Sequence, residues 1–394
     1  MPVIREKRFL RVKLDMVTRC QLRCVMCHFA HPDFKESPVT MGGELLEKVG
    51  NDLFPRAHDV VLSSSAEPLL AKDLPRALEL CREHEVPNFH FSTNLFAMSR
   101  KIMEKCIEVQ MPLLTVSVDA ATKETFERIR PPGKWDTLMD RFDLVKEIKD
   151  MSGSEFPRLS ATAVLMRSNI REMPDLIRLM ATKGVTQMNF VHMAVMGGLG
   201  IEDETLMNDP KLCNETLREM RRVADEVGIE AMIPMEIPEK IAADTVTDAA
   251  RSSDGGGSAL LQSAEMKGVE GSYNVAQYLN HKIDEFLLKA KKKEDHQRAC
   301  YFPWYYIHVN PDGTVFPCGS WFEFSTFGDF NTQTFEEIWT GKDFTELRRQ
   351  IRHMELRDVC ANCSVANMGR PDVLASFSHR AKVRRGNKQS SPKG

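Results

Sequence analysis

Hydrophobic and polar positions alternate in short blocks along the first half of the chain, and longer stretches with helical spacing separate these blocks. The β-rich runs cover residues 12–17, 60–64, 88–93, 113–118, 159–165 and 186–191. The helical stretches cover residues 43–53, 75–84, 99–109, 135–148 and 173–183. Strands that alternate with helices are typical of βα units and a parallel sheet. The pattern therefore predicts an α/β fold with a partial (β/α)6 barrel over about residues 11–190.

The second half of the chain changes character several times. Further predicted elements are a helix at 212–227, a short strand at 231–234, a helix at 278–293 and a helical stretch at 335–354. Between them, residues 242–271 contain a Ser- and Gly-rich segment that reads as a flexible loop, either a lid over the substrate opening or a disordered insertion. Strands at 305–309 and 314–317 flank the turn signal Asn310-Pro311-Asp312-Gly313, which predicts a β-hairpin.

Three cysteines follow directly after the first β-rich run. Cys20, Cys24 and Cys27 have the spacing C-x3-C-x2-C, which suits one face of a four-iron cluster. The fourth iron then has no protein ligand, and open metal positions are where catalysis takes place. A zinc site is the alternative, which His28 and His31 keep open, whereas disulfides are not expected in a chain without a signal-peptide pattern.

A second set of four cysteines lies near the C-terminus. Cys300 precedes the predicted hairpin, Cys318 ends it, and Cys360 and Cys363 form a C-x2-C pair. Four thiolates suit either zinc or an iron–sulfur cluster. The other three cysteines, Cys81, Cys106 and Cys213, stand apart from both sets, and we expect buried, inert thiols there.

Composition and charge exclude several classes of protein. The chain has 394 residues, enough for two or three domains, and its 53 basic and 56 acidic side chains leave a net charge of −3. We therefore expect no nucleic-acid partner and no membrane partner, and the basic tail at 380–394 is expected to be disordered. No apolar run approaches the roughly 18 residues of a membrane span, and no signal peptide is evident, so we expect a cytoplasmic protein.

The C-x3-C-x2-C spacing resembles that of the radical S-adenosylmethionine (SAM) superfamily. The resemblance implies a four-iron cluster held by Cys20, Cys24 and Cys27, whose open iron binds SAM. It implies a barrel of the radical SAM type, with reductive cleavage of SAM to a 5'-deoxyadenosyl radical. One departure is Met26, which stands where the family often has an aromatic residue.

The ends of the later strands extend the resemblance. Ser64-Ser65-Ala66-Glu67-Pro68 resembles the family's Gly-Gly-Glu-Pro segment with both glycines replaced, and Ser92-Thr93-Asn94 resembles its Thr-Asn-Gly segment. The resemblance implies that SAM is bound by Ser65, Ala66, Glu67, Asn94, Ser117, Asp119 and Arg130. Helix N-capping is the structural alternative for Asn94 and Asp119. After the sixth strand, His192 and its neighbours Asn189 and Met193 are either substrate-facing or structural.

The C-terminal cysteines resemble the SPASM and twitch extensions of radical SAM enzymes. The shared features are the hairpin between Cys300 and Cys318, the motifs Gly328-Asp329-Phe330 and Phe335-Glu336-Glu337-Ile338-Trp339, and the pair Cys360 and Cys363. Because no cysteine follows Cys363, the resemblance implies a single auxiliary four-iron cluster, as in the shorter twitch form. The expected cofactors are two 4Fe–4S clusters, one catalytic and one auxiliary, and SAM.

These features predict four regions. Residues 1–195 form the radical SAM partial barrel, and residues 196–298 complete the barrel and hold the insertion and linker. Residues 299–372 form the auxiliary-cluster domain, a small β-hairpin plus a helix, and residues 373–394 form the basic tail.

The expected activity is hydrogen abstraction from a small molecule such as a sugar or an aminocyclitol. The auxiliary cluster would take up the electron, giving dehydrogenation or oxidative bond formation, and a flavodoxin or ferredoxin would supply the reducing electron. Epimerisation with Cys213 as hydrogen donor and modification of a ribosomal peptide are the alternatives. A small molecule is favoured because the core begins about a dozen residues after Met1, which leaves no room for a preceding peptide-recognition domain. A zinc-stabilised binding protein is the non-enzymatic alternative.

Overall fold

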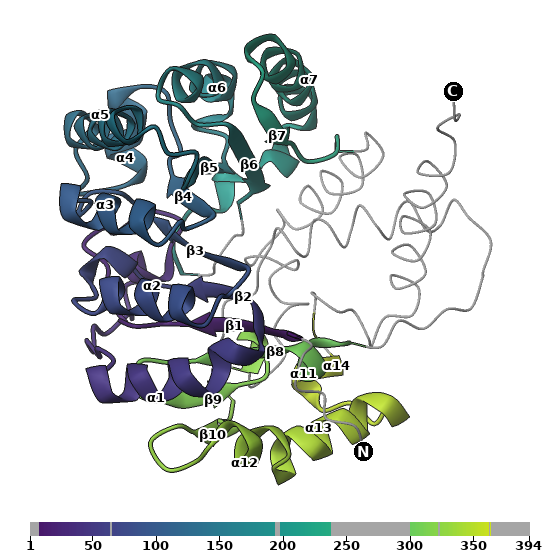
Figure 1. The fold of residues 1–394 in the computed structure, drawn as a ribbon. Helices are drawn as coiled ribbons and strands as arrows, with labels where there is room; N and C mark the ends of the chain where they lie inside the picture. Colours follow the sequence, from purple (N-terminus) through teal and green to yellow (C-terminus); the bar gives the residue numbers. More distant parts are fainter. Residues whose placement is uncertain are drawn as a thin grey trace, which may run out of the picture.

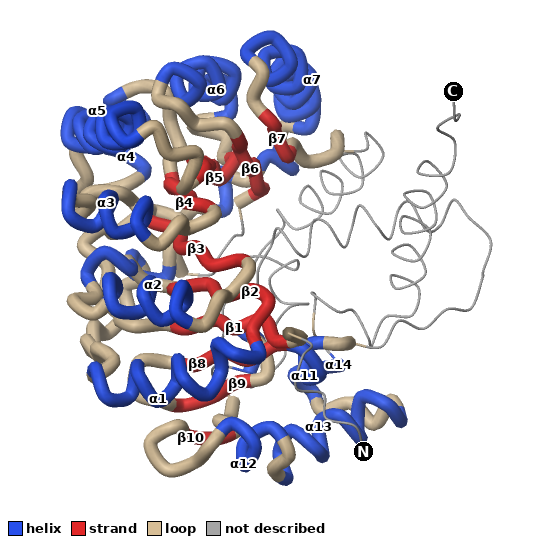
Figure 2. Tube along the Cα trace, viewed as in Figure 1, coloured by secondary structure: helices blue, strands red, loops and turns tan. Residues whose placement is uncertain are grey.

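A curved parallel sheet with helices along one face makes up most of the molecule (Figures 1 and 2). The structure is a computed structural model that describes residues 8–63, 65–193, 198–237, 300–321, 324–361 and 363. The predictions for 242–271, for the helix at 278–293 and for the tail at 380–394 lie outside these residues. No helix in the described ranges is long and apolar enough to cross a membrane.

Strands and helices alternate through the first part of the chain, close to the predicted runs. The strands are β1 Leu10–Leu14, β2 Ala57–Leu62, β3 Asn88–Thr93, β4 Leu113–Ser117, β5 Arg158–Leu165, β6 Gln187–His192 and β7 Glu230–Met232. The helices are α1 Gly43–Leu53, α2 Leu74–Glu83, α3 Arg100–Glu108, α4 Lys123–Ile129, α5 Trp135–Ser152, α6 Met173–Thr182 and α7 Pro210–Val227. Only α4 among these elements has no counterpart in the prediction.

The C-terminal part adds a hairpin and several short helices. Its elements are α11 Phe302–Tyr305, β8 Tyr306–Val309, β9 Thr314–Phe316, β10 Gly328–Asp329, α12 Phe335–Trp339, α13 Lys342–His353 and α14 Asp358–Ala361. The prediction of one helical stretch over 335–354 is wrong, because the helix is interrupted at Gly341, between α12 and α13. A Cβ atom at Gly341 would lie 2.6 Å from the carbonyl oxygen of Glu337, so this close approach needs glycine.

All ten strands belong to one sheet with the order β10-β9-β8-β1-β2-β3-β4-β5-β6-β7. Strands β1 to β7 run parallel, and β8 pairs in parallel with the other side of β1, with Lys13 opposite His308. Strands β9 and β10 then continue the sheet in antiparallel fashion. The hairpin is therefore an extension of the barrel sheet, which the sequence pattern did not indicate.

The two faces of the sheet differ in chemistry because side chains alternate along each strand. In β1, Leu10, Val12 and Leu14 are fully buried against the helix layer, whereas Arg11 and Lys13 point to the opposite, inner face. Register partners share a face, so polar rows cross this inner face. One row joins Ser92, Thr115, Ser160 and Gln187, and the next joins Ser117, Thr162 and Asn189. The concave face of the barrel thus carries two rows of hydroxyl and amide groups.

The C-terminal helices are also anchored on the barrel. Asp52 at the end of α1 accepts a hydrogen bond of 2.6 Å from the backbone N–H of Phe335, at the start of α12. Arg56 pairs with Glu336, and its guanidinium lies 5.0 Å from the ring centroid of Phe335. These contacts join segments about 280 residues apart in the chain and hold the second thiol set near the first strand.

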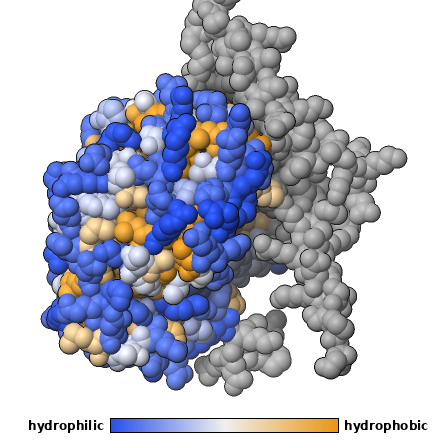
Figure 3. Space-filling model, turned by 90° about the horizontal axis from the view of Figure 1, so that it is seen from above, coloured by the Kyte–Doolittle hydropathy of each residue, from blue (hydrophilic) through white to orange (hydrophobic). Residues whose placement is uncertain are grey.

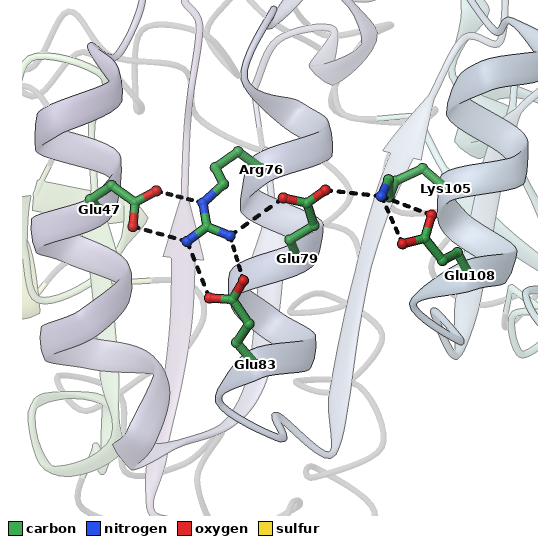
Figure 4. A network of polar contacts seen from close by, with 6 residues as sticks. All are labelled: Glu47, Arg76, Glu79, Glu83, Lys105 and Glu108. Carbon is green, nitrogen blue, oxygen red and sulfur yellow. Dashed lines mark hydrogen bonds and ion pairs between the residues drawn. The ribbon is translucent and has the colours of Figure 1, made fainter.

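Charged side chains cover the outer face of the helix layer. Figure 3 shows a face that is mostly hydrophilic, with apolar areas that are small and separate. On this layer, Arg76 of α2 binds Glu47 of α1 and Glu83 of its own helix, and Lys105 of α3 binds Glu79 at 2.9 Å (Figure 4). The network links three neighbouring helices across the surface.

The Arg76 network predicts a small, salt-dependent contribution to stability. Replacing Arg76 by Met should lower the free energy of unfolding by about 1 kcal/mol at low ionic strength, because exposed ion pairs are screened and weak. Denaturant titration at low and at molar salt measures this change in the free energy of unfolding, with Arg82→Met on the same helix as the control. An equal loss at both salt concentrations would contradict the ionic origin of the effect.

Candidate active site

The three-cysteine loop that follows β1 is held by backbone hydrogen bonds to the segment after α4. The N–H of Arg23 donates to the carbonyl of Pro131 at 2.6 Å, and the N–H of Val25 donates to the carbonyl of Ile129 at 2.9 Å. Within the loop, the N–H of Cys27 donates to the carbonyl of Cys24 at 2.9 Å. The loop is thus fixed in shape by the chain, with its three thiols half-buried and free.

Two thiols of the loop have an N–H donor beside the sulfur. Asn94 Nδ2 lies 3.6 Å from Cys20 Sγ, and Arg130 Nη1 lies 3.7 Å from Cys24 Sγ. Burial raises the pKa of Cys24 to about 11, and the Arg130 charge opposes this shift. N–H groups beside cluster sulfurs are one means by which a protein tunes an iron–sulfur centre. Three thiols on one loop, two of them facing N–H donors, fit a cluster ligand set.

Glu67 ties the end of β2 to the end of β3. Its side chain is only 2% exposed and accepts hydrogen bonds from Thr93 Oγ1 at 2.6 Å, Asn94 N at 2.8 Å and Leu69 N at 3.1 Å. Burial raises the pKa of Glu67, and these three donors oppose the shift. The carboxyl group is therefore engaged by the chain itself and positions the neighbouring segments.

Asn94 connects this cluster of strand ends to the cysteine loop. Its Oδ1 accepts from Gln21 Nε2 at 2.9 Å and from the N–H of Phe96 at 3.1 Å, while its Nδ2 faces Cys20. The N-cap alternative for Asn94 accounts only for the bond from the N–H of Phe96, because the amide oxygen also accepts from Gln21 and the amide nitrogen faces Cys20. Asn94 thus fixes the first thiol of the loop relative to β3.

A buried ion pair holds the second thiol. Arg130 Nε lies 2.6 Å from Asp119 Oδ2, with exposures of 7% and 0% for the two residues. Asp119 Oδ1 also accepts the N–H of Val164 at 2.7 Å, at the end of β5. Although burial disfavours the cation, Asp119 and Cys24 hold the pKa of Arg130 above its ordinary value. Arg130 therefore stays charged beside the loop.

The other predicted residues occupy different surroundings. Ser65 Oγ donates to Asp15 Oδ2 at 3.2 Å, and the carbonyl of Ala66 accepts from Ser63 Oγ at 2.9 Å. Ser117 is half-buried on the inner face at the end of β4. Cys213 is fully buried in the hydrophobic core in the first turn of α7, where burial raises its pKa to about 12. In the described part of the chain, no hydrogen bond links Cys213 to the cysteine loop, and its donor role stays a prediction.

The remaining residues singled out after the sixth strand divide between the two faces. Asn189 belongs to the polar inner row, whereas His192 is paired in register with Leu165 on the helix side. Burial lowers the pKa of His192 to about 4, so it is neutral at physiological pH. Met193 packs with Ile129 and Met166 in a small apolar cluster beside Val25 and Met26 of the loop.

The second thiol set gathers at one end of the hairpin. Cys318 follows β9, Cys360 lies in α14, and Cys300 and Cys363 flank the C-terminal elements. Burial, with smaller contributions from the other three thiols, raises the pKa of Cys318 to about 12, so all four are electrostatic neighbours. Among the described residues, no three cysteine, histidine or carboxylate groups are close enough to hold one metal ion. The donor chemistry of four thiols fits a thiolate-ligated centre.

Two residues that the sequence pattern did not select meet close to the loop. Asp15 follows β1, and its Oδ2 lies 2.8 Å from His308 Nε2 on β8, across 293 positions of sequence. Each of the two is a polar residue in or beside an apolar strand run, which could have marked it as a candidate. A local sequence pattern cannot show that two residues so far apart are in contact.

Comparisons with known proteins agree with this geometry. The profile of the Radical SAM superfamily matches residues 14–180, and that of the SPASM iron-sulfur cluster-binding domain matches residues 300–364. The chain belongs to the radical SAM superfamily and carries a C-terminal SPASM domain. It is therefore a radical SAM enzyme, with SAM and a 4Fe–4S cluster as cofactors. The SPASM domain adds auxiliary iron–sulfur cluster binding.

Curated relatives of this radical SAM enzyme are distant. Fe-coproporphyrin III synthase of Methanosarcina barkeri is 25% identical over 224 residues, which is 56% of this chain and 53% of the relative. GTP 3',8-cyclase of Marinobacter nauticus is 24% identical over 198 residues, which is 50% of this chain and 57% of the relative. The chain thus spans about half the length of the curated relatives it matches.

Solved structures confirm the predicted fold of this radical SAM enzyme. SuiB of Streptococcus suis bound to precursor peptide SuiA has a TM-score of 0.57 at 12% identity, over 92% of this chain and 71% of that chain. Native anSMEcpe with bound AdoMet has a TM-score of 0.55 at 16% identity, over 89% of this chain and 86% of that chain. The mixed α/β partial barrel with a C-terminal hairpin is thus confirmed.

The Glu67 contacts predict a structural loss from a change of one atom. In Glu67→Gln an amide NH2 group must face a hydrogen-bond donor, and a buried donor left unsatisfied costs about 1 to 3 kcal/mol. We expect a loss of about 2 kcal/mol in the free energy of unfolding, measured by denaturant titration. Glu104→Gln, an exposed change on α3, is the control and should be neutral. A neutral Glu67→Gln would contradict the tie between β2 and β3.

Proposed function

We propose that this radical SAM enzyme oxidises a small hydroxylated molecule, such as a sugar or an aminocyclitol, at a carbon that carries a hydroxyl group. Cys300, Cys318, Cys360 and Cys363 would hold one auxiliary four-iron cluster, which would supply an acceptor for the electron that the substrate loses. An external flavodoxin or ferredoxin supplies the electron that starts each turnover. Epimerisation and peptide modification are the competing activities, and the product analysis below separates them.

The pairing of β8 with β1 is the observation that carries this proposal. The loop with Cys20, Cys24 and Cys27 follows β1, and Cys318 follows the hairpin partner of β8. Figure 1 shows β1 and β8 side by side, and β9 is the next strand after β8, so both thiol sets are attached to the same part of one sheet. A substrate at the inner face beside β1 would lie between a radical source and an electron acceptor, as an oxidation requires.

The polar rows of the inner face support a hydroxylated substrate. Ser117, Thr162 and Asn189 form the polar row nearest to the carboxyl ends of the strands, and all three are half-buried. The apolar pair Val164 and Val191 follows on the same face. Active sites of barrels lie at this end. Hydroxyl and amide side chains offer both donors and acceptors, and a few such groups fix the orientation of a polar ligand.

The chain's own residues have distinct tasks in this proposal. Cys20, Cys24 and Cys27 hold the catalytic cluster, and its open iron leaves room for SAM. The bound cofactors supply a carbon-centred radical that removes hydrogen from an unactivated carbon. Asn94 and Arg130 hold the sulfur atoms in place, and Asp119 orients Arg130. The neighbouring strand ends, including Ser65 and Ala66, border the position proposed for SAM.

Metal analysis tests the assignment of the two thiol sets. Anaerobically purified protein should contain about eight iron and about eight sulfide per chain, for two four-iron clusters. A triple variant with Cys20, Cys24 and Cys27 changed to Ala should keep about half of both, because the SPASM thiols are intact. About two zinc ions per chain after anaerobic reconstitution would instead favour a zinc-stabilised protein.

Product analysis tests the reaction itself. Reconstituted enzyme with SAM and dithionite is screened against aminocyclitols, inositols and aldohexoses, and against cysteine- and serine-containing peptides. We expect 5'-deoxyadenosine together with a product lighter than an aminocyclitol or sugar probe by two hydrogen atoms. A product of unchanged mass with an inverted centre would indicate an epimerase, and turnover of the peptides alone would overturn the small-molecule proposal.

A further inference from the structure

A buried carboxyl–imidazole pair joins the barrel to the SPASM hairpin. Asp15 lies just beyond β1 and His308 lies on β8, with exposures of 2% and 4%. Oδ2 of Asp15 is 2.8 Å from Nε2 of His308, and the same oxygen accepts the hydroxyl of Ser65 at 3.2 Å. The pair is thus held from three strands, because Ser65 follows β2.

The contacts around the pair determine where the imidazole proton lies. An ionised carboxylate only accepts hydrogen bonds, so Nε2 of His308 carries the hydrogen that is shared with Asp15. Nδ1 then holds a lone pair. Among the described residues this Nδ1 atom is buried and has no hydrogen-bond partner. Buried polar atoms are rarely left unpaired, and a catalytic role is one explanation for such a nitrogen. His90 and His192 also have a buried, unpaired ring nitrogen, so the position of His308 has to carry the argument.

The position of the pair also points to the substrate. Register pairs Lys13 with His308, so His308 lies on the polar inner face of the sheet rather than on the helix side. Ser65, one contact away, belongs to the segment next to the position proposed for SAM. In the other direction, β8 leads through β9 to Cys318. Asp15 and His308 therefore lie between the two thiol sets, on the face that carries the polar rows.

We propose that His308 is a catalytic residue whose Nδ1 atom accepts the hydroxyl proton of the substrate, and that Asp15 is the positioning residue that holds its imidazole. Lys13, on the same face, is an electrostatic neighbour of Asp15. An imidazole oriented by a carboxylate is a common general base, and such bases contribute about 10²- to 10⁴-fold to rates. This inference rests on the proposed oxidation and names its proton acceptor.

The step balances in atoms and electrons. Oxidation of a CH–OH group to a carbonyl removes two protons and two electrons. One proton and one electron leave together as the hydrogen atom taken from carbon by the SAM-derived radical. The O–H bond then breaks, its proton goes to Nδ1 of His308, and the remaining electron reduces the auxiliary iron–sulfur cluster. The electrons left on oxygen and carbon form the second bond of the carbonyl group.

A measurement without substrate tests the pair directly. In holoenzyme labelled with ¹⁵N at histidine, the ring-nitrogen shifts report which nitrogen carries the hydrogen, and His308→Gln identifies the His308 signals. We expect the Nε2–H form, and we expect Asp15→Asn to change this signature. A hydrogen on Nδ1 of neutral His308 would overturn the proposal, because that atom could then accept no proton.

Turnover of an oxidised probe tests the role in catalysis. His308→Gln keeps a donor for Asp15 and loses the base, so on an aminocyclitol probe that the wild type oxidises, kcat should fall about 100-fold with KM little changed. Hydrogen abstraction should persist, so 5'-deoxyadenosine formed per product should rise. With the probe deuterated at the reacting carbon, a substrate radical that takes hydrogen back instead of being oxidised should lose the deuterium. The recovered probe should therefore contain less label. His353→Gln, an exposed change on α13, is the control.

The outcomes separate this inference from the proposed function. Wild-type turnover of an aminocyclitol together with unchanged kcat and coupling in His308→Gln would overturn the role of His308 and leave the oxidation standing. If the wild type oxidises no small-molecule probe, the proposed function fails, and the proton position on His308 still decides whether Nδ1 is an available base. Iron and sulfide contents equal to those of the wild type establish that the variant is loaded.

Discussion

The architecture depends on β1 having hydrogen-bonded partners on both sides. β2 pairs with one edge and β8 with the other, so the first strand of the barrel lies inside the sheet. A strand at an open edge presents unpaired N–H and C=O groups, and pairing with β8 removes that edge. The same pairing places the SPASM hairpin beside the strand that leads into the cysteine loop. The pairing of β1 with β8 thus satisfies the backbone hydrogen-bonding groups of β1 and determines where the two thiol sets lie relative to each other.

Buried polar groups then position the loop. A buried charge is tolerated only when it is paired and hydrogen-bonded, and Asp119, Arg130 and Glu67 all meet this condition. Their partners come from different strand ends, so each polar contact also ties one loop to another. Asn94 and Arg130 carry this rigidity to the sulfur atoms of Cys20 and Cys24. Residues expected to touch the cofactor are therefore also the residues that hold the site together.

The family assignment leaves the substrate to be argued from this chain. Matches to SuiB bound to precursor peptide SuiA and to anSMEcpe, at 12% and 16% identity, show a shared fold. The hydroxyl and amide rows on the inner face and the Asp15–His308 pair are features of this sequence. Together they favour oxidation of a hydroxylated compound, because they offer orientation for hydroxyl groups and an acceptor for one proton.

Local patterns determined the elements of this protein. Alternation and helical spacing located β1 to β6 and most helices within a few residues, since strand and helix periods are properties of neighbouring positions. The two cysteine sets and the strand-end polar residues were equally visible, because their spacing is short. The break at Gly341 was missed, since it follows from a close approach to the carbonyl of Glu337 rather than from periodicity.

Only the tertiary structure decided which distant residues meet. Asp15 and His308 are 293 positions apart, and Asp52 meets Phe335 over a similar separation. The sequence showed polar residues in or beside apolar runs, but no local pattern specifies a partner on another strand. The register of β8 against β1 arises from the packing of the whole sheet, and this register turns His308 toward the inner face. The two cysteine motifs were thus visible in the sequence, whereas the pairing beside them required the folded chain.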